Sequence, residues 1–265
     1  MADDHDIQHL YSGDPAAVAR WHKVDRLAGW IAETPGAAQG GRFMSSDDPV
    51  LLGWEVIETH AREDGVFSLR NIDAGLHDAA ARWAGRWGME CHTWQVFFAQ
   101  GSDIAGARRR SRMADSVTAT VSARPPPQDV AAAIAFMQAN GVVAFSPRIL
   151  LGRAGPSALA TARDETGHLQ GVAFGYFPCN RFSPWHRTAW CGLVAVAETA
   201  RGAGVGRAVN DLVVDAMIET HGAESVVEFV GAYNTASRRM VEGSGLRFRP
   251  DVVTCGISTG GRATR

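Results

Sequence analysis

The stretch Arg201-Gly202-Ala203-Gly204-Val205-Gly206-Arg207-Ala208 lies between a strand-like segment and a helix-like segment, and it decides the fold prediction. Its glycines let the backbone turn tightly and approach a ligand without a Cβ in the way. The first amides of the helix that follows have no partner within the helix, and the helix dipole adds partial positive charge there. The stretch therefore predicts a cradle of main-chain nitrogens for a pyrophosphate, with no need of a metal.

Other interpretations of this glycine-rich loop fit the sequence less well. A Walker loop needs Gly-Lys-Ser/Thr, which the stretch lacks. A dinucleotide-binding fold would use Glu228 as its ribose-binding acid, but only 265 − 206 = 59 residues follow the loop. That is too little chain for the remaining units of a doubly wound sheet. A turn that binds no ligand is the alternative that stays open.

The segments around the loop alternate between strand and helix periodicity. The run Arg124-Pro125-Pro126-Pro127 can continue neither a helix nor a central strand, so we read it as a stiff connector. We expect a strand at 116–122, just before this connector. After it we expect helices at 129–140 and 146–151, a hairpin at 157–163 and 168–177, a strand at 188–197, a helix at 205–220, a strand at 225–232, a helix at 235–242 and a strand at 246–257.

The first 114 residues contain a weaker echo of this order. Arg70-Asn71-Ile72-Asp73-Ala74-Gly75 follows an apolar segment as the loop at 201–206 does, at a constant offset of 201 − 70 = 131 residues. A helix-like stretch, a strand at 92–99 and a helix from Ser102 come next, so we predict an internal duplication. An aspartate and a single glycine make the first loop a poor host for a diphosphate. We therefore expect the first copy to support the second, or to shape a cleft between the halves.

Composition and charge exclude several classes of protein. The chain has 265 residues, 46% of them hydrophobic, and a formal net charge of −2. This predicts a sizeable core and argues against a dedicated nucleic-acid or membrane-surface binder. No apolar run reaches the ~18 residues that span a bilayer, and the acidic start is unlike a targeting peptide. Four scattered cysteines suggest neither a zinc site nor a disulfide framework. We expect a cytoplasmic protein, with a homodimer left open.

Residues 115–257 resemble the GNAT superfamily of acetyl-CoA-dependent N-acetyltransferases. The family signature Arg/Gln-x-x-Gly-x-Gly/Ala is matched by Arg201, Gly204 and Gly206. A second family motif, an asparagine after the next strand and a helix that ends in glycine and an apolar residue, is matched by Asn234, Gly245 and Leu246. The two motifs are linked at the spacing that the family shows.

The resemblance implies an α/β (α+β) fold with a mixed, mostly antiparallel central sheet flanked by helices. It implies two GNAT-like halves, a degenerate one at 1–114 and an acetyl-CoA-binding one at 115–265. In the family, the strand before the loop splays from its neighbour and pairs with the pantetheine arm. The residues that this assigns to the coenzyme are Val194, Ala195, Val196, Arg201, Gly202, Ala203, Gly204, Val205, Gly206, Arg207 and Asn234.

The implied reaction is direct attack of a primary amine on the thioester of acetyl-CoA. Backbone amides near Val194 to Val196 would polarise the thioester carbonyl in the manner of an oxyanion hole. Neither a metal nor a covalent intermediate is needed. We expect the acceptor to be a small molecule, because the sequence has no acidic run that would hold a basic peptide.

The acid and base of the reaction are not fixed by the resemblance. Many family members have a tyrosine where this chain has Val241, and a glutamate where it has Trp190. Glu228 is one candidate base, because a carboxylate buried in an apolar strand has a raised pKa; an edge position or a structural pair with an arginine is the alternative. His186 is the other candidate, because imidazole titrates near neutrality; a solvated loop residue is the alternative.

Three further features have two interpretations each. Cys191 is either a small buried hydrophobe or a nucleophilic thiol. Tyr233 either supplies a phenol or packs against its neighbours. The cluster Arg108-Arg109-Arg110-Ser111-Arg112 is either a solvated helix end or a site for nucleic acid or phosphate.

Two rival functions stay open at this point. Val241 and Trp190 favour a non-catalytic acyl-CoA-binding or regulatory protein. A GNAT-fold enzyme that uses a different acyl-CoA is the other.

Overall fold

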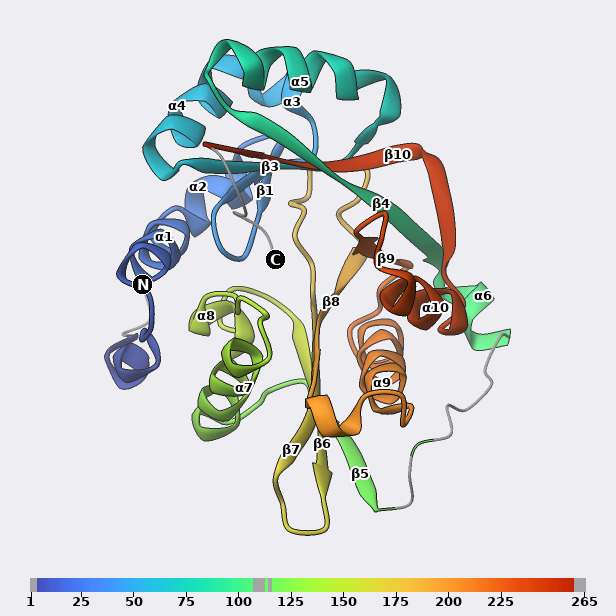
Figure 1. The fold of residues 1–265 in the computed structure, drawn as a ribbon. Helices are drawn as coiled ribbons and strands as arrows, with labels where there is room; N and C mark the ends of the chain where they lie inside the picture. Colours follow the sequence, from blue (N-terminus) through green and yellow to red (C-terminus); the bar gives the residue numbers. More distant parts are fainter. Residues whose placement is uncertain (1–3, 107–112, 114–115, 260–265) are drawn as a thin grey trace.

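One ten-stranded sheet runs through both halves of the chain, in the order β1-β2-β3-β10-β4-β9-β8-β7-β6-β5 (Figure 1). The computed structural model describes residues 4–106, 113 and 116–259. The pairs β2–β3 and β8–β9 are parallel, and the other neighbours are antiparallel. With helices on its faces, this architecture confirms the predicted mixed, mostly antiparallel fold.

The second half of the chain follows the predicted order of elements. The proline-rich connector leads into α7, whose first residue is Pro127, a residue suited to the first helical turn because no amide is needed there. The elements are β5 (Val117–Ser122), α7 (Pro127–Ala139), α8 (Pro147–Leu150), β6 (Ser157–Asp164), β7 (Leu169–Tyr176), β8 (Thr188–Val196), the 3₁₀ turn η3 (Glu198–Ala200), α9 (Val205–Glu219), β9 (Ser225–Val230), α10 (Thr235–Gly243) and β10 (Arg247–Ser258).

The first half contains the predicted helix–strand pair and several elements that the sequence did not indicate. In full, the elements of the first half are η1 (Asp4–Leu10), α1 (Pro15–Arg26), α2 (Ala28–Glu33), β1 (Ala37–Gln39), β2 (Met44–Ser46), α3 (Pro49–Leu52), α4 (Trp54–Asp64), β3 (Val66–Asp73), η2 (Ala74–Leu76), α5 (His77–Arg86), β4 (Glu90–Gln100) and α6 (Gly101–Gly106). The order β3, turn, α5, β4 repeats the order β8, turn, α9, β9.

The loop expected at 70–75 is wrong in its first part, because β3 continues to Asp73. The cause is a distant partner: Val252 and Val253 of β10 pair with Asp73 and Ile72. The Asp73 carboxylate then accepts a hydrogen bond from the Gly75 amide at 2.7 Å and begins η2. Arg70 is therefore a strand residue with a fixed direction.

The last strand of the chain lies among the strands of the first half. β10 pairs antiparallel with β3 on one side and with β4 on the other. β4, a strand of the first half, also pairs with β9 of the second half. Strands from the two halves therefore alternate at the centre of the sheet. The division into domains at 1–114 and 115–265 stays a prediction. β10 belongs to the second of these ranges but pairs with two strands of the first.

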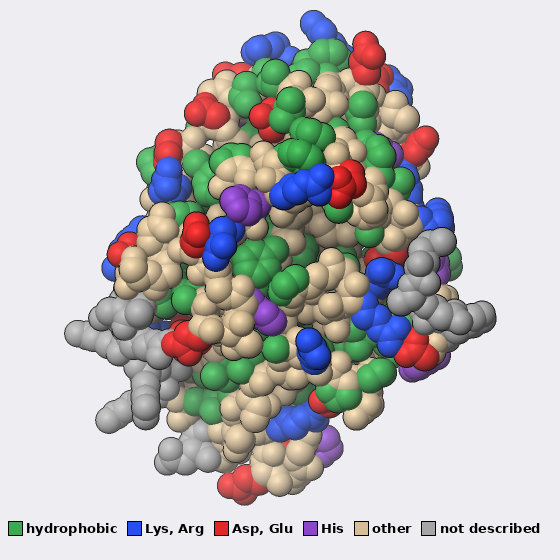
Figure 2. Space-filling model, turned by 180° about the vertical axis from the view of Figure 1, so that it is seen from behind, with side chains coloured by type: hydrophobic (Ala, Val, Ile, Leu, Met, Phe, Trp, Pro, Cys, Tyr) green, Lys and Arg blue, Asp and Glu red, His purple; other side chains and the backbone are tan. Residues whose placement is uncertain are grey.

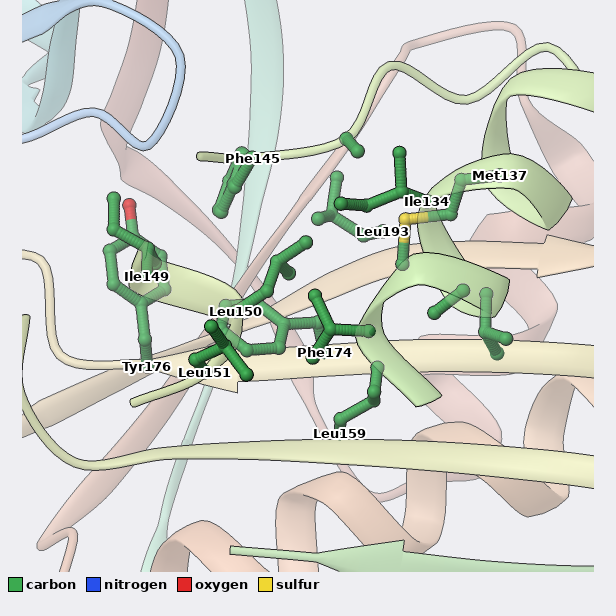
Figure 3. Close-up of a cluster of buried hydrophobic side chains, with 14 of the residues drawn as sticks. Ile134, Met137, Phe145, Ile149, Leu150, Leu151, Leu159, Phe174, Tyr176 and Leu193 are labelled. Carbon is green, nitrogen blue, oxygen red and sulfur yellow. The ribbon is translucent and has the colours of Figure 1, made fainter. Parts of the chain in front are cut away.

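Three clusters of buried side chains cover the faces of the sheet. One lies between the sheet and α7 and α8, and it includes Ile134 and Met137 of α7, Leu150 of α8 and Phe174 of β7 (Figure 3). A second lies between the sheet and α9, and a third lies under α4 and α5 in the first half. The third cluster contains Cys255 and Ile257 of β10, so the end of the chain completes the core of its beginning.

Because β10 joins the two halves, we expect Ile257→Ala to destabilise the whole molecule in one step. Ile257 is fully buried and pairs with Phe67 of β3 and Cys91 of β4. Removing its side chain should lower the free energy of unfolding by about 2–5 kcal/mol, against about 0.5–1.5 kcal/mol for Ile257→Val. Denaturant unfolding followed by circular dichroism and tryptophan fluorescence measures both, and coincident curves are expected. Two separate transitions would contradict the joint core.

Candidate active site

Strands β8 and β9 separate after three residue pairs. Thr188, Ala189 and Trp190 lie opposite Ser225, Val226 and Val227 in parallel register. β8 then continues to Val196 while its other edge stays paired with β7. Within the described residues, no strand pairs with the edge of β8 that faces β9 beyond Trp190. The splay that the family resemblance implied is therefore present, and it leaves main-chain groups free to bind an extended ligand.

A β-bulge lies at the point where the strands separate. Leu193 and Val194 of β8 together oppose Ala173 of β7, because the register shifts between the flanking pairs. Leu193 has a φ of 51°, which is uncommon for a leucine and costs free energy. Regular strand neighbours point to opposite faces, but the bulge lets both Leu193 and Val194 line the same cavity.

The glycine-rich loop follows at the open end of the splay. Gly202 and Gly204 have φ values of 82° and 81°, in the left-handed region that only glycine adopts without strain. Gly204 is the N-cap residue of α9, so the first amides of that helix have no partners within the helix. A Cβ on Gly206 would lie 3.1 Å from Cγ2 of Val196, which shows how closely α9 packs against the free edge of β8.

The polar side chains near the loop have different surroundings. Arg201 is exposed. Arg207 donates from Nη2 to the carbonyl oxygen of Gly243 at 2.5 Å and also pairs with Asp211 of the same helix, so its side chain is held against α10. Asn234 caps α10, where its Oδ1 accepts from the amide of Ser237 at 3.0 Å.

A cavity of about 250 Å³ lies beside the bulge and between the two halves. Its walls are mainly aromatic and aliphatic, and its only charged lining residues in the described chain are Arg42 and Arg70. The residues that line it are Gly40, Arg42, Phe43, Ser68, Arg70, Trp94, Val142, Phe145, Trp190, Leu193, Val194, Phe229, Thr254 and Gly256. None of these is an acid or a histidine, so the cavity wall offers no conventional general base.

Glu228 lies on the opposite face of the sheet from this cavity. It is 2% exposed and accepts a hydrogen bond at 2.8 Å from Nδ2 of Asn210 on α9. Burial raises the pKa of Glu228 to about 8, against the lowering effect of that hydrogen bond. The predicted burial is present, but the structure does not bring the carboxylate to the bulge or the cavity.

The other candidates for proton transfer also lie outside the cavity. His186 directs Nδ1 at the carbonyl oxygen of Ser183, 3.0 Å away, which requires the hydrogen on that nitrogen. Cys191 is buried beside α9, and burial raises the pKa of its thiol, which makes it an inert part of the core. Tyr233 is 99% exposed and packs on nothing. Val241 is buried, while Trp190 forms part of the cavity wall.

Sequence reasoning missed the two arginines of the cavity. Arg70 was assigned to a degenerate loop, because its pairing with a strand 180 residues later leaves no local signal. Arg42 belongs to a short turn between β1 and β2, two strands that the sequence did not indicate. The arginine cluster at 108–112 lies outside the described residues.

Two of the four cysteines come together on the far side of the sheet. Possible ligand atoms of His77, Cys91 and Cys255 all lie within 4.8 Å of one another. A hydrogen bond with Cys255 lowers the pKa of the Cys91 thiol to about 7. The scattered positions of these residues in the sequence gave no sign of this cluster, because it depends on the pairing of β10 with β4.

Comparison with known proteins identifies the second half of the chain. Residues 131–245 match the sequence model of the acetyltransferase (GNAT) family. This match, to a family of acyltransferases, covers the splayed strands and the glycine-rich loop. A comparison with curated proteins found no match.

Solved structures share the fold over most of the chain. A GCN5-related N-acetyltransferase from Kribbella flavida is 17% identical, with a TM-score of 0.53 over 83% of this chain and 79% of that chain. A Drosophila protein is 16% identical, with a TM-score of 0.57 over 97% and 96%. A tandem GNAT protein from the clavulanic acid biosynthesis pathway is 11% identical, with a TM-score of 0.51 over 91% and 89%. At these identities the likeness shows the fold.

The surface gives two further observations. Acidic and basic side chains are interspersed on the face seen in Figure 2, with hydrophobic groups between them. Across the part of the chain that the structure describes, no helix has the length and apolar character needed to cross a bilayer.

We expect Glu228→Gln to change the pH dependence of stability and to leave catalysis almost unchanged. The folded protein holds this proton up to a pKa of about 8, whereas the ordinary value is 4.5. The unfolded chain binds fewer protons in this window, so wild-type stability falls as pH rises through it. Between about pH 6 and pH 8, the free energy of unfolding should fall by about 2 kcal/mol less for the variant than for wild type. Denaturant unfolding at several pH values measures this. A loss of turnover by roughly 100-fold or more would instead make Glu228 the base.

Proposed function

We propose that this chain is an N-acyltransferase that moves an acetyl group from acetyl-CoA to a primary amine of a small molecule. The observation that carries the proposal is the early separation of β8 and β9, with a bulge and a cavity at its closed end and the glycine-rich loop at its open end. A coenzyme with a diphosphate at one end and a thioester at the other matches the chemistry of this arrangement.

The residues along the splay fit coenzyme A. The free edge of Val194, Ala195 and Val196 offers main-chain groups that would pair with the amides of pantetheine. The amides of 202–207 would hold the pyrophosphate, because those at the start of α9 have no helical partner and lie at a positively polarised helix end. A Cβ added at Gly202 would meet nothing within 4 Å, so this side of the loop is open to a ligand. Asn234 would reach the coenzyme from the start of α10.

The bulge places the chemistry. The amine nitrogen attacks the thioester carbon, a C–N bond forms, and the C–S bond breaks. The thiolate that leaves takes up a proton, and the amine nitrogen loses one. Main-chain amides at Leu193 and Val194 would stabilise the negative charge that develops on the carbonyl oxygen. Since the cavity wall has no acid or histidine, we propose that solvent or the amine itself carries the protons.

A non-catalytic acyl-CoA-binding protein is the second candidate function. The wall of the cavity favours it, because it contains neither an acid nor a histidine. Release of free thiol from acetyl-CoA with a panel of primary amines separates the two functions. Turnover with any amine supports the enzyme, and tight binding of the coenzyme without turnover across the panel supports the rival.

The loop assignment is tested by the pair Ala203→Glu and Ala203→Gln. Ala203 is exposed in the loop, so either side chain fits without strain, and the two differ only in charge. A carboxylate beside the pyrophosphate should weaken coenzyme A binding about tenfold or more, whereas glutamine should bind within a few-fold of wild type. Isothermal titration calorimetry measures the affinities. Equal affinity for the glutamate and glutamine variants would place the diphosphate elsewhere.

A further inference from the structure

Arg70 extends from β3 to the cavity with hydrogen-bond donors that no described residue satisfies. It is 4% exposed, and its Nε and Nη2 have no partner within the described chain. Its guanidinium carbon lies 5.0 Å from the ring centroid of Phe229, 5.5 Å from that of Trp190 and 5.9 Å from that of Tyr176. These rings stabilise the positive charge. Ring faces are weak acceptors, so Nε and Nη2 still lack strong acceptors.

Arg42 brings a second positive charge to the same cavity. It lies on the turn between β1 and β2, with its guanidinium carbon 5.3 Å from the ring centroid of Phe145. Its Nη2 donates to the carbonyl oxygen of Val143, while its Nε has no partner among the described residues. Burial and, to a smaller extent, the charge of Arg70 lower the pKa of Arg42 to about 10. The two cations are therefore close enough to repel each other.

No acid neutralises this pair in the part of the chain that is described. The carboxylate that interacts with Arg70 over a longer range is that of Asp47, which is 7% exposed. Among the described residues, it forms an ion pair with neither guanidinium. A buried charge without a partner costs free energy that the rest of the fold must offset. An anion that binds in the cavity would remove this cost.

We infer that this cavity binds a carboxylate between Arg70 and Arg42, beside the thioester. A carboxylate presents two oxygens in a plane and matches the paired donors of a guanidinium. It could be carried by the acceptor, which would then be an amino acid, or by the far end of a dicarboxylic acyl group on the coenzyme. The inference rests on the proposed function, because the cavity adjoins the bulge where the thioester would lie.

The same two charges explain how an amine could react here without a conventional base. Cations close to a bound amine disfavour its ammonium form and so favour the neutral nucleophile. The volume of about 250 Å³ is at the small end of ligand pockets. It suits a free amino acid or a short acyl chain better than a side chain on a folded protein.

The test uses the full chain and two sets of probes in titration calorimetry. In the acceptor set, N-acetylglycine, N-acetylalanine and N-acetylphenylalanine are compared with their amides on protein saturated with coenzyme A. In the acyl set, succinyl-CoA is compared with acetyl-CoA and butyryl-CoA. In at least one set, we expect the carboxylate form to bind roughly 10- to 100-fold more tightly than its uncharged match. The set that shows the preference identifies which molecule carries the carboxylate.

Arg70→Gln supplies the decisive comparison. It should abolish the carboxylate preference, leave coenzyme A affinity within a few-fold, and not lower the thermal midpoint, because an unpaired buried charge is removed. Arg70→Lys keeps the charge without the fork and should retain part of the preference. Arg62→Gln, an exposed residue of α4 that pairs with Glu58, is the matched control and should behave as wild type.

The outcomes separate this inference from the proposed function. Wild-type protein that binds coenzyme A but prefers the carboxylate in neither set overturns the inference alone. A preference that survives Arg70→Gln overturns it as well, because the anion is then held elsewhere. Wild-type protein that fails to bind coenzyme A contradicts the proposed function and this inference together.

Discussion

The structure depends on the loss of pairing between β8 and β9 after Trp190 and Val227. Two parallel strands that stayed in register would satisfy each other's main chain and leave no room for a ligand. The bulge at Leu193 and Val194 prevents this, because its extra residue turns the edge of β8 away from its regular course. The free edge of β8 then leads from the cavity at Leu193 and Val194 toward the start of α9. The uncommon φ of Leu193 is the cost of that arrangement.

The first half has the same order of elements as the second, but the space between its two corresponding strands, β3 and β4, is filled by β10. β3 and β4 both run antiparallel to β10, so they are parallel to each other, as β8 and β9 are. Where β8 and β9 separate, β10 lies between β3 and β4 and pairs with both. The chain's own last strand therefore occupies the place that corresponds to the proposed coenzyme groove. This leaves the first half with a different role, which is to supply one wall of the cavity through Arg70, Ser68 and Trp94.

Local signals were enough to predict most of the second half. Glycines with left-handed φ values, the proline connector and clear periodicity are all properties of neighbouring residues, so the elements from 116 onward agree with the prediction to within a few residues. The position of β10 could not be predicted, because pairing between residues 180 apart leaves no local pattern. The surroundings of Glu228 show the same limit: its burial followed from its apolar strand, but the face on which it lies depends on the packing of α9. Trp190 was noted for the absence of a glutamate, and only the fold shows it as a wall of the cavity.

A crystal structure of the protein with coenzyme A tests the central claim most directly. We expect the pyrophosphate to accept hydrogen bonds from the amides of residues 202–207, the pantetheine arm to lie along Val194–Val196, and the sulfur to end beside the bulge at the mouth of the cavity. Coenzyme bound at another surface under saturating conditions, with the space between β8 and β9 closed by side chains, would contradict this assignment.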